Sequence, residues 1–230
     1  MPIRIRQHVN PLARKFQRPL QVPNWQEVYS VVDRPWHLDI GCARGKFLLD
    51  MAQLHPEVNF LGIEIRQQLV DLANQTKAEL GLTNLHYLFG NINSSASVLL
   101  SSLPGDMQTI SIQFPDPWFK KKHNKRRVVQ PDLVTGLVTR LVDGGKIFIQ
   151  SDIEEVAIEM RDRFAASPLL VRQHATAWLE TNPLPVATER ELYVLNQGLP
   201  VYRAWFKKLA KGKGVADSSN DVQNNTVRSF

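Results

Sequence analysis

The stretch ISIQFPDPWFKKKHNKRRVVQ, residues 110–130, places one acid beside a dense run of positive charge. The apolar residues 110–114 indicate a buried strand, and Asp116 follows that strand between two prolines. Each proline restricts the neighbouring backbone, so the carboxylate is ordered before any ligand arrives. Six lysines and arginines then occupy residues 120–127. This arrangement suits chemistry on a polyanion, although a Pro-Asp-Pro turn also fits a purely structural role.

A glycine-rich turn, LDIGCARGKF, is the second candidate for chemistry. It reads D-x-G-x-A-x-G, with Asp39 two residues before Gly41. Glycines between a strand and a helix let a ligand approach the backbone closely, although they also serve packing alone. A carboxylate at this place disfavours a pyrophosphate and suits a cationic group, such as the amino group of S-adenosylmethionine.

Two further polar side chains follow predicted strands. Glu64 closes the segment FLGIEIR, and an acid at this place can accept both hydroxyls of a ribose. Asn91 follows the next strand in FGNIN, where its amide can pair with the edge of an adenine. Plain structural interpretations are a solvated acid for Glu64 and turn chemistry for Asn91.

The elements that would position these residues alternate between strand and helix. Such repeated β-α units indicate an α/β, Rossmann-like fold, with a mostly parallel sheet and helices on both faces. Ligands of these sheets bind at the carboxyl ends of the strands, where each candidate residue lies. The predicted strands are 36–40, 58–65, 85–89, 109–114 and 146–150, and the predicted helices are 47–54, 69–80, 131–141 and 152–164.

Length and composition favour a single globular domain. The chain has 230 residues and 43% hydrophobic content, which suffices for one buried core. A single cysteine, Cys42, excludes an internal disulfide framework and fits a reducing cytoplasm. No apolar run approaches the roughly 20 residues that cross a membrane, and no Cys/His cluster has metal spacing. We expect a cytoplasmic monomer or homodimer without a membrane or metal partner.

The net charge of +6 is unevenly distributed along the chain. Basic residues gather before the first acid, Glu27, again in 120–127, and more loosely in 203–213. Three clusters favour a polyanionic partner over a merely solvated surface. Composition further predicts three segments, namely a flexible basic arm over 1–20, a folded domain over 21–210 and a disordered polar tail over 211–230.

With these residues in view, the chain resembles the bacterial tRNA (guanine-N7-)-methyltransferases, a family of class I S-adenosylmethionine-dependent methyltransferases. The resemblance spans about residues 36–207. Its strongest element is PDPWFKKKHNKRRVV, which is similar to the family signature PDPW-x-K-x-x-H-x-K-R-R, and DIGCARG, GIE and TERE support it. The resemblance implies methyl transfer from S-adenosylmethionine to N7 of a guanine in tRNA, guanosine 46 of the variable loop.

The resemblance also implies roles for individual positions. Asp116 matches the family's proposed catalytic residue, whereas Ala43 and Asn91 depart from its commoner glycine and aspartate. The implied cofactor-binding residues are Asp39, Gly41, Glu64, Asn91 and Asp116, and the implied substrate-binding residues are Lys120, Asp152, Thr188, Glu189, Arg190 and Glu191. The rest of the basic run is expected to bind RNA phosphates, through Lys121, Lys122, Lys125, Arg126 and Arg127.

Several residues admit a structural alternative. Asp152 also fits a helix N-cap, and Thr188 with Glu191 also fits a capping box. Trp118 can stack on a base or anchor its loop in the core. His123 fits a surface histidine better than an RNA contact.

Other classes of protein make different demands on these motifs. A nicotinamide dehydrogenase needs a G-x-G-x-x-G turn, which is missing here. A methyltransferase of exocyclic amines would carry a [DNS]-P-P-[YF] tetrapeptide in place of PDPW. An RNA-binding protein on a decayed methyltransferase fold would lose the acids at the strand ends, yet Asp39, Glu64 and Asp116 are all present.

Overall fold

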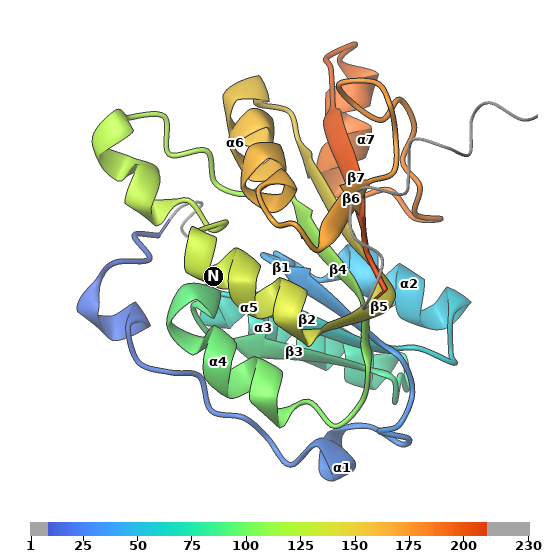
Figure 1. Ribbon diagram of the computed structural model, residues 1–230. Coiled ribbons are helices and arrows are strands. Elements are labelled where there is room, and N and C mark those ends of the chain that lie inside the picture. Colours follow the sequence, from blue (N-terminus) through green and yellow to red (C-terminus); the bar gives the residue numbers. More distant parts are fainter. Residues whose placement is uncertain (1–8, 211–230) are drawn as a thin grey trace, which may run out of the picture.

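A seven-stranded sheet organises the chain, of which the computed structural model describes residues 9–210 (Figure 1). The strand order is β3-β2-β1-β4-β5-β7-β6, and only the pairings of β7 with its two neighbours are antiparallel. The chain order reverses between β1 and β4, which makes their carboxyl ends the natural ligand site. The strands are β1 (Trp36–Ile40), β2 (Asn59–Glu64), β3 (Leu85–Phe89), β4 (Met107–Gln113), β5 (Leu141–Ser151), β6 (Leu170–Arg172) and β7 (Tyr202–Lys208).

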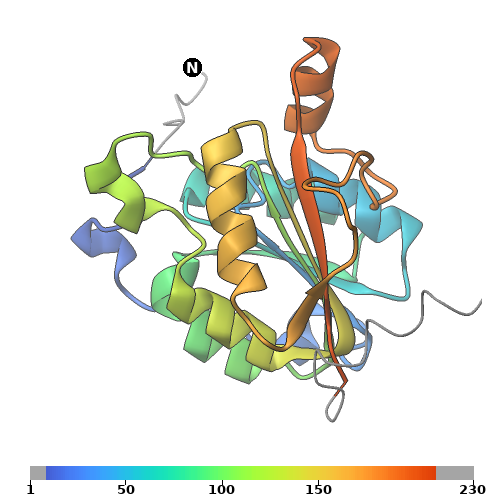
Figure 2. The ribbon, with the colours of Figure 1, turned by 45° about the horizontal axis from the view of Figure 1, so that its top comes forward.

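Helices cover both faces of the sheet. One face carries α4, α5 and α6, and the other carries α2 and α3 (Figures 1 and 2). The helices are α1 (Trp25–Val28), α2 (Lys46–Leu54), α3 (Gln67–Glu79), α4 (Ile92–Ser102), α5 (Pro131–Arg140), α6 (Glu154–Ala165) and α7 (Glu189–Asn196), with short 3-10 turns η1 (Arg14–Phe16) and η2 (Lys121–Arg126).

Burial on both faces explains the continuous apolar strands of the sequence. Every residue of β1 and β2 is buried, as expected for parallel strands between two helical layers. The larger core includes Leu99, Leu133 and Val156 from α4, α5 and α6. A second core joins Leu48 of α2 and Val70 of α3 on the other face. These two cores hold the strand ends at fixed positions.

The predicted α/β class, parallel sheet and five strands are confirmed, but several further elements were not foreseen. The strands β6 and β7 and the helices α1 and α4 had no counterpart among the predicted elements, and α7 was foreseen only through the capping box at Thr188 and Glu191. In addition, β5 begins at Leu141, immediately after α5, and is longer than predicted.

The predicted flexible arm over 1–20 needs correction for its second half. Phe16 and Leu20 are buried, and both are tied to α4. Ser94 Oγ donates to Phe16 O over 3.2 Å, and Leu20 N donates to Ser95 Oγ over 3.0 Å. Residues 9–20 are therefore part of the folded unit, while 1–8 and the predicted tail 211–230 lie outside the described residues.

Candidate active site

Asp39 is the last residue but one of β1, beside the point where the strand order reverses. Ser111 Oγ donates to Asp39 Oδ1 over 2.6 Å, and Gln113 Nε2 donates to the same atom over 3.3 Å. Burial raises the pKa of Asp39 to about 6 against the effect of these two hydrogen bonds, and the charge of Glu64 adds to the rise. The side chain is thus a buried carboxylate at neutral pH, which suits a cationic partner.

The glycine-rich turn after Asp39 contains three left-handed residues, Gly41 (φ 83°), Ala43 (φ 50°) and Gly45 (φ 76°). A Cβ on Gly45 would lie 2.5 Å from the ring of Tyr87, whereas a Cβ on Gly41 would meet nothing within 4 Å. Gly45 therefore serves helix packing as well as conformation. Gly41 leaves open space beside the backbone, where a ligand can approach closely.

Glu64 ends β2 and is engaged by two partners. Ala43 N donates to its Oε2 over 3.0 Å, which ties the glycine-rich turn to β2. The guanidinium of Arg66 binds both carboxylate oxygens, through Nε at 2.8 Å and Nη2 at 2.9 Å. Because Arg66 holds both oxygens, ribose hydroxyls must share or replace these bonds if Glu64 binds them.

Asn91 shows the turn chemistry that was its structural alternative. It is the N-cap of α4, and its side chain accepts from Asn93 N over 3.1 Å. Its Nδ2 donates to Pro11 O over 3.1 Å, which links the N-terminal residues to the end of β3. An adenine contact through this amide requires that one of these bonds be exchanged.

The loop that carries Asp116 is bracketed by two strained residues. Phe114 and Trp118 have φ values of 49° and 45°, in the left-handed region that favours glycine. Each costs about 1–3 kcal/mol, and such strain gathers at functional sites. Phe114 N donates to Gln150 O over 2.8 Å, so the loop departs from the sheet at a fixed point. Asp116 itself is half-buried.

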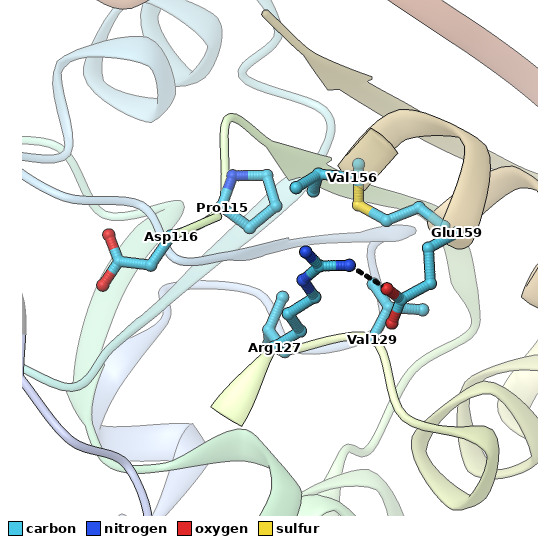
Figure 3. A pocket seen from close by; sticks show the side chains of 8 residues that line it. Pro115, Asp116, Arg127, Val129, Val156 and Glu159 are labelled. Atoms are coloured by element: carbon cyan, nitrogen blue, oxygen red, sulfur yellow. Dashed lines mark hydrogen bonds and ion pairs between the residues drawn. The ribbon is translucent and has the colours of Figure 1, made fainter. Parts of the chain in front are cut away.

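Arg127 corrects one prediction for the basic run. It is buried, donates to Pro117 O over 2.8 Å and pairs with Glu155 and Glu159 of α6. Figure 3 shows the Arg127–Glu159 pair on one side of a small pocket, with the Asp116 carboxylate pointing away from it. Arg127 therefore clamps the Asp116 loop onto α6 and is not available to RNA phosphate.

The rest of the run forms η2 and stays at the surface. Lys121, Lys122 and Lys125 are exposed, while the Arg126 guanidinium lies 4.9 Å from the centre of the Trp118 ring. The edge of the His123 ring also meets Trp118. A cavity of about 250 Å³ beside η2 is lined by Asp116, Pro117, Trp118, Phe119, Lys120 and His123, so the predicted catalytic acid and a predicted substrate residue line the same cavity.

The substrate residues predicted after β5 and before α7 come together in part. Asp152 is not an N-cap, because Ile153 caps α6; the Asp152 carboxylate instead pairs with the exposed Arg190. Thr188 is the N-cap of α7 and accepts from Glu191 N over 3.1 Å, so its capping interpretation is confirmed. Glu189 is exposed beside Arg190.

Glu191 departs from its predicted contact with substrate. It is 1% exposed and receives Arg203 Nη2 at 2.7 Å, Asn182 Nδ2 at 2.7 Å and Gln150 Nε2 at 3.1 Å. Its carboxylate is thus fully used inside the protein. Arg203 and Lys208 are also buried, so Lys207 is the one exposed basic residue of the third cluster within residues 9–210.

Comparisons with known proteins identify the family. Residues 33–204 match the family described as "Putative methyltransferase". A tRNA (guanine-N(7)-)-methyltransferase of Microcystis aeruginosa is 58% identical over 89% of this chain and 98% of its own length. The protein of that name from Synechocystis is 57% identical over 90% of this chain and 98% of its own length.

The chain belongs to the tRNA (guanine-N(7)-)-methyltransferase family.

Solved structures agree with this family at the level of the fold. The 16S rRNA methyltransferase KamB aligns with a TM-score of 0.54 at 15% identity, over 84% of this chain and 96% of its own. TrmN from Thermus thermophilus aligns with a TM-score of 0.52 at 17% identity, over 80% of this chain and 48% of its own. The family predicted from the PDPW signature and the class I methyltransferase fold are both confirmed.

Four residues that contact the predicted site residues were not predicted from the sequence, namely Arg66, Gln113, Gln150 and Arg203. A weak signal exists for the glutamines, because each directly follows a buried isoleucine at the carboxyl end of its strand. Arg66 and Arg203 carry no local pattern that distinguishes them from surface arginines. Within residues 9–210, no group of His, Cys, Asp and Glu could hold a metal ion, and no helix is long and apolar enough to span a membrane.

Proposed function

We propose that the protein transfers the methyl group of S-adenosylmethionine to N7 of a guanine in tRNA, and that guanosine 46 of the variable loop is its target. The observation that carries this proposal is the position of the Asp116 loop. The loop connects the end of the sheet that holds the buried acids Asp39 and Glu64 with the exposed lysines of η2. The names of its close relatives support the same reaction. We further propose that it acts in the cytoplasm, as a monomer or a homodimer.

The residues at the carboxyl ends of β1, β2 and β3 fit S-adenosylmethionine. Asp39 offers a buried negative charge for the amino group, and the open backbone at Gly41 leaves room for the chain of the ligand. Glu64 would accept the ribose hydroxyls and Asn91 would pair with the adenine, each by exchanging a hydrogen bond that it makes within the protein. When bound, S-adenosylmethionine supplies an electrophilic methyl group on a positively charged sulfur.

Asp116 would act by charge and position rather than as a base. Guanine N7 has an in-plane lone pair and no proton to remove, so the protein has to hold it in line with the methyl group. Positive charge then passes to the guanine, and a fixed carboxylate beside both groups keeps the charge balanced. Lys120 lines the same cavity as Asp116 and would bind the target nucleotide.

Mass analysis of tRNA nucleosides tests this function directly. Unmodified tRNA incubated with the protein and S-adenosylmethionine should gain 7-methylguanosine, and tRNA with adenosine at position 46 should gain none. Methylation of another base would overturn the proposed reaction, while 7-methylguanosine at another position would overturn only the target. Tight tRNA binding without any methylation would instead identify an RNA-binding protein.

The ribose role of Glu64 predicts a loss of cofactor affinity. Replacing Glu64 by alanine should weaken S-adenosylmethionine binding by about 1–3 kcal/mol, because the hydroxyls lose their acceptor and the turn loses the bond from Ala43. Titration calorimetry measures this effect. Glu57→Ala, at the exposed turn before β2, is the control and should bind like the wild type. Unchanged affinity in Glu64→Ala would place the ribose elsewhere.

The exposed lysines of η2 should act on RNA phosphates. Replacing Lys121, Lys122 and Lys125 together by alanine should weaken tRNA binding and flatten its salt dependence, by up to about 0.7–0.9 log units for each phosphate that is no longer neutralised. Cofactor affinity should hardly change. The measurement is tRNA affinity at several salt concentrations. Arg127 is left in place because its removal would release the Asp116 loop from α6.

A charge-matched variant controls for net charge. Lys146, Arg172 and Lys207 are exposed on β5, β6 and β7, where Lys146 in the middle of β5 is the register partner of Lys207. Replacing these three by alanine removes the same charge far from Asp116. If both triple variants show the same salt slope, η2 has no special role in phosphate binding.

A further inference from the structure

A chain of buried amides crosses the sheet and ends on Asp39. Gln113 and Gln150 are register partners on β4 and β5, and both are buried. Gln150 Nε2 donates to Gln113 Oε1 over 2.8 Å, and Gln113 Nε2 donates onward to Asp39 Oδ1 over 3.3 Å. The far end reaches Arg203, the register partner of Gln150 on β7.

The direction of this chain is set by Arg203. A guanidinium can only donate, so Gln150 must turn its carbonyl oxygen toward Arg203 Nε, 3.2 Å away. The amide group of Gln150 then faces Gln113 Oε1 and Glu191 Oε2. Gln113 in turn must present its NH₂ group, and not its oxygen, to Asp39. Arg203 lies on β7, three strands away from β1, and it thus determines that Asp39 accepts a hydrogen bond from the NH₂ group of Gln113.

A second chain approaches the same oxygen from within β1 and β4. His37 Nε2 lies 2.8 Å from Ser111 Oγ, which gives its proton to Asp39 Oδ1 over 2.6 Å. Both chains therefore end on Oδ1. No described residue donates a hydrogen bond to Oδ2, the oxygen that is left for a ligand.

We propose that Gln113, Gln150 and the Arg203–Glu191 pair are positioning residues, which saturate Asp39 Oδ1 and leave Oδ2 to the amino group of the methyl donor. This inference rests on the proposed function and names a further part of its cofactor site. It also links the cofactor site to α7, because Glu191 of that helix accepts from Gln150 and Arg203. A role in packing alone would need no fixed direction of donors.

Loss of the chain should change how cofactor binding depends on pH. The pKa of Asp39 is about 6, so its carboxylate is present above that pH and is lost as pH falls through it. Removing a donated hydrogen bond raises this pKa further, so affinity for a cation should fall at a higher pH.

The neighbouring His37 and Cys42 should not change their charge in the pH range where Asp39 titrates. Burial lowers the pKa of His37 to about 3 and raises the pKa of Cys42 well above its usual range, so both are neutral near pH 6. Glu64, the other acid nearby, is held by the guanidinium of Arg66.

Gln150→Met tests the proposal, since it nearly keeps the shape of the side chain and removes both the donor and the acceptor of its amide. S-adenosylmethionine affinity, measured by calorimetry from pH 5 to pH 8, should fall about three- to tenfold at neutral pH, and the midpoint should move up by roughly one unit. Gln113→Leu removes the donor to Asp39 together with the acceptor of Gln150, and it should show the same shift, which keeps the test open if Gln150→Met does not fold.

Asn84→Leu is the matched control, because the buried side-chain amide of Asn84 donates, among the described residues, to the backbone carbonyls of 52, 55 and 58. It should lower stability without moving the midpoint. A Gln113→Leu profile that superimposes on the wild type would overturn the positioning role. A wild type that binds no S-adenosylmethionine would overturn the proposed function as well.

Discussion

Replacing Asp116 by asparagine should reduce methyl transfer to tRNA by at least about a hundredfold while the protein still folds. The amide keeps the shape of the side chain and removes the charge that balances the transfer of positive charge to guanine. The fold should survive, because the loop is held by Phe114 N on Gln150 O and by Arg127 on Pro117 O. Single-turnover methylation, with a thermal melt of each variant, measures both effects.

The matched control for this variant is Asp106→Asn. Asp106 is exposed just before β4, at the opposite end of the strand that leads to Asp116. The same chemical change there should leave the rate unchanged. S-adenosylmethionine affinity of Asp116→Asn should stay within about tenfold of the wild type. A variant that methylates tRNA at nearly the wild-type rate would contradict the catalytic role of Asp116.

The parts of the fold that were predicted correctly rest on local patterns. The strands 36–40 and 85–89 were predicted with the observed bounds, because each is a short, mostly apolar segment that a glycine follows, Gly41 or Gly90. The strand end is also a local feature, which is why Asp39, Glu64 and Asp116 could be named from sequence. Helix α4 was missed because its serines and asparagine hide the apolar spacing.

The incorrect assignments depend on partners that are distant in the sequence. Arg127 looks like its five basic neighbours, and only Glu155 and Glu159 of α6 make it structural. Glu191 looks like a surface acid at the start of a helix, and only Arg203 makes it internal. The burial of a charged side chain depends on which element packs above it, and a run of like residues carries no information about that.

The buried pair of Glu191 and Arg203 leads to the second large effect. Replacing Glu191 by leucine should lower the free energy of unfolding by about 3–5 kcal/mol, because a buried guanidinium loses its counter-ion. The double variant Glu191→Leu/Arg203→Met should recover much of this loss, since it leaves no buried charge unpaired. Urea unfolding of the wild type and both variants measures the difference.

Glu189→Leu separates this role from contact with substrate. Glu189 begins the same helix but is exposed, so its removal should leave the free energy of unfolding within about 0.5 kcal/mol of the wild type. If Glu191 instead bound substrate, Glu191→Leu would keep its stability and lose only tRNA affinity. That result would contradict the internal role of Glu191. A stability loss that the double variant reverses would show that Glu191, the last residue of the TERE motif, acts by holding Arg203. Glu191 would then also fix the Nε group of Arg203 that donates to Gln150.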